Sequence, residues 1–248
     1  MRDAKRVLIF GATSAVAAEV AVIHAQRGDR LHLVGRSPEK LAAVVARCGS
    51  QATSETADFD KLDSNEALVA SCIEKLGGLD TVLIAHGDLR DQIASERAFA
   101  EAEATLRTNF LSAVSLVIPI ANYFEDQRSG RLCVIGSVAG DRGRPRNYTY
   151  GAAKGALTIY LEGVRTRLYS AGVRVTTIKL GPVHSPMTRD HEKNVLFAQP
   201  EAVARDIVDA IDAGVGETYV PSVWAAIMPV VKHMPESLIQ KLAFLSGR

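Results

Sequence analysis

Residues 6–34 read RVLIFGATSAVAAEVAVIHAQRGDRLHLV, and the pattern of this stretch decides the fold class. It begins with the apolar run Arg6–Phe10 and ends in a second one, Arg30–Val34. Between them, a turn at Gly11 leads into helical periodicity over Ala15–Arg27. Two short apolar runs joined through a helix are typical of neighbouring parallel strands. The stretch therefore predicts a strand–helix–strand unit of a parallel sheet.

The same alternation continues along the chain. Ser37-Pro38-Glu39 is a strong helix start, and Asp63–Glu66 resembles a capping box at the start of another helix. Further strands are expected at Ala52–Ala57, Thr81–Ala85, Arg131–Ile135, Val173–Lys179 and Thr218–Val220, and further helices at Arg97–Phe124, Tyr148–Ser170 and Pro200–Ala213, the last closed by Gly214. The pattern predicts one α/β domain over residues 1–248, a Rossmann-like, doubly wound parallel sheet of about seven strands with helices on both faces.

Composition and charge exclude several classes of protein. The 248 residues carry a formal net charge of +1, which provides no field for nucleic acid or an anionic membrane. The three cysteines, Cys48, Cys72 and Cys133, are odd in number and form neither a redox nor a metal spacing. The apolar run Val7–Phe10 is shorter than a signal-peptide core, and no run reaches the ~18 apolar residues of a membrane span. We expect a cytoplasmic protein with no metal and no nucleic-acid partner.

The turn after the first strand resembles a phosphate-binding loop. It reads Phe10-Gly11-Ala12-Thr13-Ser14-Ala15-Val16-Ala17 and opens a helix whose free N–H groups suit a pyrophosphate. Alanines stand where a dinucleotide loop commonly has its second and third glycines, so a tight turn without a ligand is the alternative. If the loop binds a dinucleotide, the contacts fall on Gly11, Thr13, Ser14, Ala15 and Val16.

The end of the second strand bears on the choice of cofactor. An NAD-preferring protein is expected to place an acid here for the ribose hydroxyls, whereas this chain has Val34-Gly35-Arg36-Ser37. Arg36 can make a charge-assisted contact with a 2′-phosphate, and Ser37 can add a hydroxyl donor. We therefore predict NADP(H), with NAD(H) as the alternative cofactor and an ordinary solvated arginine as the alternative for Arg36.

Tyr150 and Lys154 lie four residues apart, hence on one face of the predicted helix. Ser137 follows the strand Arg131–Ile135, and Asn109 lies within the long preceding helix. A free phenol has a pKa near 10, so it is a poor proton donor or acceptor at neutral pH unless a positive charge stabilises its anion. Lys154 can provide that charge. Ser137 can polarise an oxygen atom of a bound substrate that exchanges a proton with Tyr150.

In this order the Gly11 loop, Asn109, Ser137, Tyr150 and Lys154 resemble the short-chain dehydrogenase/reductase family in its compact form. The resemblance covers nearly the whole chain, and further matches lie at Asp58, Gly87, Pro182, Val183 and Ser185. A departure is Ile84-Ala85-His86-Gly87, where the family has Asn-Asn-Ala-Gly. We expect His86 to support the backbone, with a contact to cofactor or substrate as the alternative.

The resemblance implies an NADP(H)-dependent oxidoreductase that interconverts a carbonyl and a secondary alcohol of a small-molecule substrate. Tyr150 is then the general acid/base, Lys154 also holds the nicotinamide ribose, and Asn109 holds a water that connects Lys154 to solvent. Asp58 lies near the adenine, Ser185 near the nicotinamide amide, and a homodimer or homotetramer is the expected assembly. The alternative from another class is a sensor or scaffold that binds NADP(H) without turnover.

The remaining sequence gives weaker indications of the substrate. Arg142, Arg144 and Arg146 can attract an anionic group, although a solvated loop is the simpler interpretation, and 184–199 has the length of a substrate lid. Apolar pieces at Tyr219–Val231 and Leu238–Leu245, with Trp224, Ile227 and Met228 at near-helical spacing, favour a subunit interface over a peripheral membrane contact. Together with the Ala-His-Gly turn and the Arg-rich loop, this tail is loosely similar to bacterial reductases of polyprenyl-linked keto-sugars. A membrane-associated reductase of lipid-linked keto-sugars is therefore a further alternative function.

Overall fold

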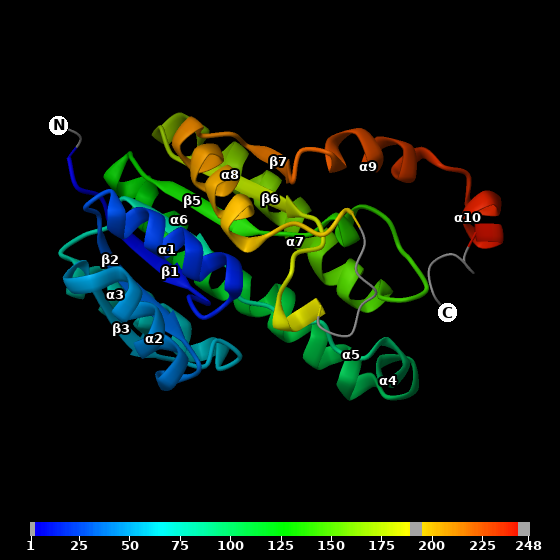
Figure 1. Cartoon of the computed structure of the whole chain (residues 1–248), viewed down its shortest axis with the longest axis horizontal. Coiled ribbons are helices and arrows are strands. Elements are labelled where there is room, and N and C mark those ends of the chain that lie inside the picture. Colours follow the sequence, from blue (N-terminus) through cyan, green and yellow to red (C-terminus); the bar gives the residue numbers. More distant parts are fainter. Residues whose placement is uncertain (1–2, 189–194, 243–248) are drawn as a thin grey trace.

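A computed structural model describes residues 3–188 and 195–242 of the chain. Its strands form one sheet in the order β3-β2-β1-β4-β5-β6-β7, with every pair parallel (Figure 1). The strands are β1 (Arg6–Phe10), β2 (Arg30–Gly35), β3 (Ala52–Thr56), β4 (Thr81–Ile84), β5 (Arg131–Ile135), β6 (Arg174–Leu180) and β7 (Glu217–Val220). The predicted doubly wound sheet of about seven parallel strands is confirmed.

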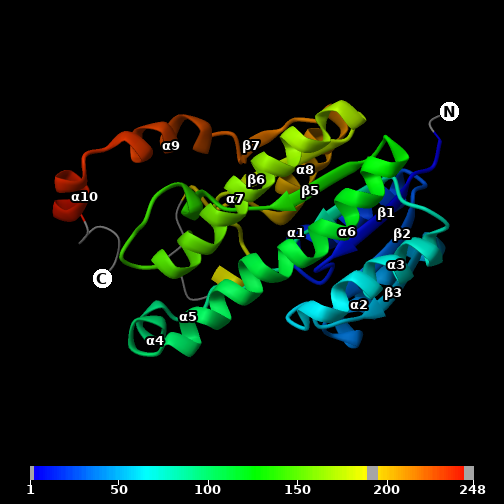
Figure 2. The same ribbon diagram turned by 180° about the vertical axis from the view of Figure 1, so that it is seen from behind.

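Helices cover both faces of this sheet (Figures 1 and 2). One face carries α1 (Ala15–Gln26), α2 (Pro38–Cys48) and α8 (Pro200–Ala213), and the other carries α3 (Asn65–Leu76), α6 (Ser112–Gln127) and α7 (Tyr148–Leu168). Side chains of β1 alternate between the two faces, because successive residues of a strand point to opposite sides. Val7 and Ile9 belong to the core beneath α1 and α8, and Leu8 and Phe10 belong to the core beneath α3 and α6.

The sheet order reverses between β1 and β4, and this point places the candidate site. The chain leaves β1 toward β2 on one side and leaves β4 toward β5 on the other, so the loops that follow these two strands diverge. Ligands of such sheets bind at the carboxyl ends of the strands at this switch point. The loop after β1 begins at Gly11, and the loop after β4 contains His86 and Gly87.

The long helix predicted over Arg97–Phe124 is divided in the structure. A short helix α4 (Gln92–Arg97), which the sequence pattern does not predict, precedes α5 (Phe99–Leu106). A π-helical turn over Arg107–Leu111 then joins α5 to α6. The residue pattern does not reveal such a turn, because a π-turn is defined by its i→i+5 backbone hydrogen bonds, which no residue type marks. The turn contains Asn109.

The capping box predicted at Asp63–Glu66 is not formed. A 3₁₀ turn over Leu62–Ser64 precedes α3, and the Ser64 side chain makes no cap hydrogen bond to this helix. Its hydroxyl donates instead to the carbonyl oxygen of Lys61 at 2.7 Å. The short polar run thus closes a local turn in place of a helix cap, which is a common alternative for serine.

One helical stretch, Phe99–Gln127, is long and apolar enough to span a membrane by length and composition. Half of its most apolar window is buried inside the fold, as in a core helix of a globular protein. Leu116 and Ile120 of α6, for example, are fully buried against the sheet.

The C-terminal helices α9 (Trp224–His233) and α10 (Glu236–Leu242) extend away from the sheet (Figures 1 and 2). Trp224 and Met228, predicted to face a partner or a membrane, are buried in a cluster with Val138 of the same chain. That prediction is wrong for these two side chains, because helical spacing identifies an apolar face without showing what covers it. Parts of two predicted segments, 189–194 of the lid and 243–245 of the apolar tail, lie outside the described residues.

Candidate active site

The loop after β1 has a tight backbone that requires glycine at its first position. Gly11 has a φ of +76°, and a Cβ added there would lie 2.5 Å from the backbone nitrogen of His86. The loop is fixed on its other side because the Gly11 amide donates to the carbonyl oxygen of Val34 at 2.9 Å. Only glycine combines this φ with such a close approach, so the loops after β1 and β4 lie in direct contact.

The loop leads into the N-terminus of α1. Ser14 caps the helix, and its side-chain oxygen accepts a hydrogen bond from the Ala17 amide at 3.2 Å. Ala15 and Val16 are the first residues of the helix, where N–H groups have no acceptor within the helix. Both line the cavity described next, so this end of α1 can hold an anion.

Two adjoining cavities of about 220 and 290 Å³ form one cleft over the switch point. They share the walls made by Ser14 and Ala15 of the phosphate loop, by 85–87 after β4, and by Ser185 and Met187. The first cavity extends to Ser137, Tyr150 and Lys154, and the second extends to Arg36. Ser137, Tyr150 and Lys154 therefore lie at one end of the cleft, and Arg36 lies at the other.

The far end of the cleft carries positive charge. Arg36 and Lys40 both line the second cavity, and Arg36 also lines a hollow of about 10 Å³ with Asp58 and Phe59. Ser37, predicted as a hydroxyl donor for the cofactor, caps α2 and accepts a hydrogen bond from the Lys40 amide at 3.3 Å. It lines neither cavity, and its predicted cofactor contact remains a prediction.

Tyr150 and Lys154 project from α7 into the first cavity of the cleft. Burial raises the pKa of Tyr150 to about 12, and a hydrogen bond with Ser137 acts in the opposite direction. The Lys154 ammonium lies 5.9 Å from the centre of the Tyr150 ring and donates to the carbonyl oxygen of Ile135 at 3.1 Å. Burial lowers the pKa of Lys154 to about 8, whereas the charge of Asp88 acts in the opposite direction. A protonated phenol thus lies beside a cation that is easily deprotonated.

Asn109 lies behind Gly87 and does not line the main cavity. Its Nδ2 donates to the Thr105 carbonyl oxygen at 3.0 Å and to the carboxylate Oδ1 of Asp88 at 3.1 Å. Its Oδ1 accepts from the Asp88 amide at 3.2 Å. A Cβ added at Gly87 would lie 2.7 Å from Asn109 Oδ1 and 3.5 Å from Lys154 Nζ. Three features together set the space next to Lys154: the π-turn that carries Asn109, the side chain of Asp88, and the lack of a side chain at Gly87.

His86 occupies the wall where the cavities meet, and its hydrogen bonds determine its tautomer. The Ser112 hydroxyl donates to the carbonyl oxygen of Thr108 at 2.7 Å, so its oxygen accepts from His86 Nε2, which is 2.7 Å away. Nδ1 then carries a lone pair, and it is buried with no partner among the described residues. Burial lowers the pKa of His86 to about 3, so the ring is neutral. The ring bonds to a side chain of α6, and the prediction that it supports the backbone is wrong.

A buried ion-pair network anchors the turn that carries Ser137. Asp141 ends this turn (Val138–Asp141), and its Oδ1 lies 2.8 Å from the ammonium of Lys179 on β6. The Tyr219 hydroxyl donates to Asp141 Oδ2 at 2.6 Å, and Glu217 Oε1 lies 2.8 Å from Lys179. Lys179 of β6 and Tyr219 of β7 therefore both hold the turn in place through Asp141.

The sequence-predicted residues lie around the cleft with few exceptions. Lining it are Gly11, Thr13, Ser14, Ala15, Val16, Arg36, Gly87, Ser137, Tyr150, Lys154, Pro182, Val183 and Ser185. Asp58 borders the adjacent hollow. The sequence did not single out Lys40 or Asp88, although Lys40 lies one helical turn after Arg36 and could have been found from that spacing.

The three arginines of the loop before α7 have different surroundings. Arg144 lines the main cavity, where burial lowers its pKa. Arg142 donates to the carbonyl oxygen of Lys232 at 3.0 Å and so supports α9, and Arg146 is exposed. Only Arg144 is positioned to meet a ligand in the cleft.

Comparison with known proteins identifies the family. A family model described as short chain dehydrogenase matches residues 5–196. An uncharacterized oxidoreductase of Mycobacterium tuberculosis is 33% identical over 223 residues, which cover 88% of each chain. An uncharacterized oxidoreductase of Streptomyces coelicolor is 31% identical over 244 residues, which cover 96% of each chain.

Solved structures agree at the level of the fold. A crystal structure of levodione reductase matches with a TM-score of 0.81 at 20% identity, over 91% of this chain and 99% of that one. A short chain dehydrogenase/reductase family protein matches with a TM-score of 0.78 at 23% identity, over 87% and 94% of the two chains. The chain therefore belongs to the short-chain dehydrogenase/reductase family and is an oxidoreductase.

Proposed function

We propose that the protein uses NADP(H) to interconvert a carbonyl and a secondary alcohol, with Tyr150 as general acid/base. The observation that carries this proposal is the first cavity of the cleft, where Tyr150, Lys154 and Ser137 meet in a space that the phosphate loop also lines. A buried phenol beside an ammonium and a hydroxyl is suited to proton transfer to an oxygen. The small cavity suits a small-molecule substrate.

The residues of the cleft fit a nicotinamide dinucleotide. The amides of Ala15 and Val16 suit the pyrophosphate, and Arg36 with Lys40 suits a 2′-phosphate, which favours NADP(H) over NAD(H). His86 can add an acceptor, since it lines a hollow that holds about one water-sized atom and its buried Nδ1 has no partner among the described residues. A ribose hydroxyl or an adenine amino group is a donor of that size. Pro182, Val183 and Ser185 lie where they can contact the nicotinamide.

The cofactor supplies the hydride when bound, and the chain's own residues handle the proton. In the reducing direction Tyr150 gives its proton to the carbonyl oxygen while the carbonyl carbon receives the hydride; in the oxidising direction Tyr150 takes the hydroxyl proton. Lys154 stabilises the phenolate that remains, and Ser137 donates to the reacting oxygen. Asp88 favours the charged form of Lys154 against burial, so it supports this role.

Asn109 acts from behind the cleft. Its side-chain amide is held by Thr105 and Asp88, so its direct effect is to position Asp88 next to Lys154. The water that the family resemblance assigns to Asn109 remains a prediction. This geometry makes Asn109 a positioning residue.

For the assembly and its location we propose a cytoplasmic homodimer or homotetramer. Ile118 on α6 and Ile159 on α7 are exposed at 47% and 70%, which supports an apolar contact between copies. The three cysteines are free and buried, as suits a reducing compartment. Burial of Trp224 and Met228 removes the main support for the lipid-linked keto-sugar alternative.

The first experiment is a titration with NADPH and NADH that follows nicotinamide fluorescence. We expect NADPH to bind more tightly than NADH, and Arg36→Ala to weaken NADPH binding by about 10- to 150-fold, the effect of one charged hydrogen bond. NADH binding by this variant should be unchanged. If neither nucleotide binds to the wild-type protein, the proposed function is wrong.

A second variant separates catalysis from a sensor or scaffold role. Tyr150→Phe should bind NADPH as the wild type does and lose turnover in a screen of ketones and secondary alcohols. A wild-type protein that binds NADPH but gives no turnover with any member of the screen, and whose cellular role survives Tyr150→Phe, would support the non-catalytic alternative.

A further inference from the structure

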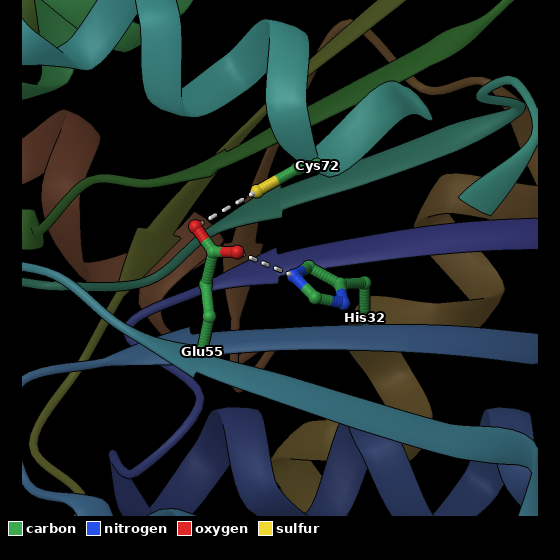
Figure 3. Close-up of side chains that lie close together, drawn as sticks. All are labelled: His32, Glu55 and Cys72. Carbon is green, nitrogen blue, oxygen red and sulfur yellow. Dashed lines mark hydrogen bonds and ion pairs between the residues drawn. The ribbon is translucent and has the colours of Figure 1, made fainter. Parts of the chain in front are cut away.

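Three potential metal ligands meet on the α3 side of the sheet, away from the cleft. His32 lies on β2, Glu55 on β3 and Cys72 on α3, and one donor atom of each lies within 4.8 Å of the other two. Figure 3 shows the three side chains converging, with Glu55 between His32 and Cys72. His32 and Cys72 are buried, whereas Glu55 is only partly covered. None of the three lines the cavities of the candidate active site.

Hydrogen bonds determine which nitrogen of His32 carries the proton. The Thr53 hydroxyl donates to the carbonyl oxygen of Leu31 at 3.3 Å, so its oxygen accepts from His32 Nδ1, which is 2.8 Å away. Nε2 is then a lone-pair donor, and it is buried without a hydrogen bond to any described residue. A histidine whose second nitrogen is fixed by an outer partner is the usual arrangement of a metal ligand.

The free nitrogen points at a carboxylate. His32 Nε2 lies 3.5 Å from Glu55 Oε2, and the His32 side chain is only 2% exposed. A lone pair and a carboxylate repel each other at this distance unless a positive charge lies between them. A proton on Nε2 or a metal ion can provide that charge, and the geometry distinguishes the two.

The distance between His32 and Glu55 matches two ligands of a tetrahedral ion better than a direct hydrogen bond. Bond lengths of ~2.0 to 2.3 Å at tetrahedral angles place nitrogen and oxygen ligands ~3.4 Å apart and oxygen and sulfur ligands ~3.6 Å apart. The structure has 3.5 Å between His32 Nε2 and Glu55 Oε2, whereas the Cys72 thiol donates a long hydrogen bond of 3.9 Å to the other carboxylate oxygen, Oε1. A direct N–H···O bond would be ~2.9 Å.

We propose that His32, Glu55 and Cys72 bind one Zn²⁺ ion. Thiolate and imidazole ligands favour zinc over magnesium or calcium, and three protein ligands leave a fourth position for water. Binding releases the thiol proton of Cys72 to the buffer. Lys75 contacts Glu55 Oε2, but its side chain is 50% exposed and can turn into solvent, so it competes weakly. The ion joins the edge strand β3 to β2 and α3.

The test is a Zn²⁺ titration of the untagged full chain, stripped with a chelator and followed with a competing chromophoric chelator. We expect one ion per chain and a rise in Tm of about 5 to 10 °C at a hundredfold excess over Kd. His32→Gln and Cys72→Ser should each weaken binding by more than about 100-fold, and Thr53→Val by about 10- to 100-fold. Cys48→Ala, a buried free cysteine on the opposite face, is the matched control and should bind as the wild type does.

Cobalt gives a readout that needs no variant. Co²⁺ bound to the wild-type chain should show the near-ultraviolet charge-transfer absorption of a thiolate ligand. The proposal is overturned if the wild type binds no stoichiometric Zn²⁺, if the Co²⁺ complex lacks that absorption, or if folded His32 and Cys72 variants bind as tightly as the wild type. If the wild type binds no stoichiometric Zn²⁺, a proton on His32 Nε2 explains why this nitrogen lies next to the Glu55 carboxylate. These outcomes do not depend on nucleotide binding, so they are separate from the test of the proposed function.

Discussion

Replacing Lys154 with methionine should stabilise the fold while it removes the ammonium group that the proposed chemistry requires. Lys154 is 3% exposed. Among the described residues, no carboxylate lies within hydrogen-bond distance of its ammonium group, which donates to a backbone carbonyl oxygen instead. Burial lowers its pKa from the ordinary 10.5 to about 8. The folded state therefore disfavours the charged form that is present at neutral pH.

The magnitude follows from that drop in pKa. It corresponds to about 3 kcal/mol of destabilisation at pH 7, and methionine removes this term. The variant also loses the hydrogen bond from Nζ to the Ile135 carbonyl oxygen, which offsets about 1 kcal/mol. A net gain of about 2 kcal/mol raises Tm by about 4 to 8 °C in a chain of this size.

The stability difference between the variant and the wild type should depend on pH. Between pH 8 and 10.5 the unfolded chain binds more protons at this lysine than the folded chain does, so the wild type gains stability as pH rises through that window. The variant lacks this gain, and its advantage should fall by about 2 kcal/mol between pH 7 and 9.5. Thermal unfolding of both proteins at the two pH values measures this difference, because other titrating groups cancel between them.

Lys179→Met is the matched control, because Lys179 is also 3% exposed but is paired. Its ammonium lies 2.8 Å from both Asp141 and Glu217, and those hydrogen bonds raise its pKa in spite of burial. Removing it leaves carboxylates unpaired and should destabilise the fold by about 3 kcal/mol. The reasoning is refuted if Lys154→Met is no more stable than the wild type at pH 7, or if its gain is the same at both pH values.

Two further variants test the walls of the cleft. His86→Phe keeps an aromatic ring but removes the Nδ1 acceptor, so NADPH affinity measured by fluorescence should fall by about 2- to 10-fold; an unchanged affinity would mean that no cofactor group meets this nitrogen. Gly87→Ala should lower the free energy of unfolding by about 1 to 3 kcal/mol in urea denaturation, because the added methyl group would lie 2.7 Å from Asn109 Oδ1. Its control, Gly163→Ala on an open face of α7, should be stabilising by about 0.5 to 1 kcal/mol, and equal effects at both positions would contradict the assigned crowding.

The sheet was predictable because its strands are short apolar runs between clear turns. Arg6–Phe10 and Arg131–Ile135 agree with the structure at both ends, since the first lies before the Gly11 turn and the second between Gly130 and Gly136. The π-turn at Asn109 was not predictable, because no residue type marks its i→i+5 backbone hydrogen bonds. Spacing could suggest the apolar face of α9, but only packing shows that this face covers Val138.

The candidate site was predictable where its residues follow strands and share helix faces. Tyr150, Lys154 and Ser137 are of this kind, and the structure brings them to one end of a cleft. The acceptor at His86 was not predictable, since it depends on a hydroxyl of α6 that fixes the ring. The three metal ligands proposed here come from three separate elements, so no local spacing indicates them.

The packing of α9 on Val138 has a consequence for the order in which the site is completed during synthesis. Ser137 and its turn leave the ribosome well before Trp224 and Met228, which cover the turn from behind. Tyr219, which also holds the turn through Asp141, is another late residue. Ser137 therefore acquires the full packing support of its turn only after residues 219–228 have been made. If Ser137 has the role proposed above, full activity requires that synthesis has run through the first turns of α9.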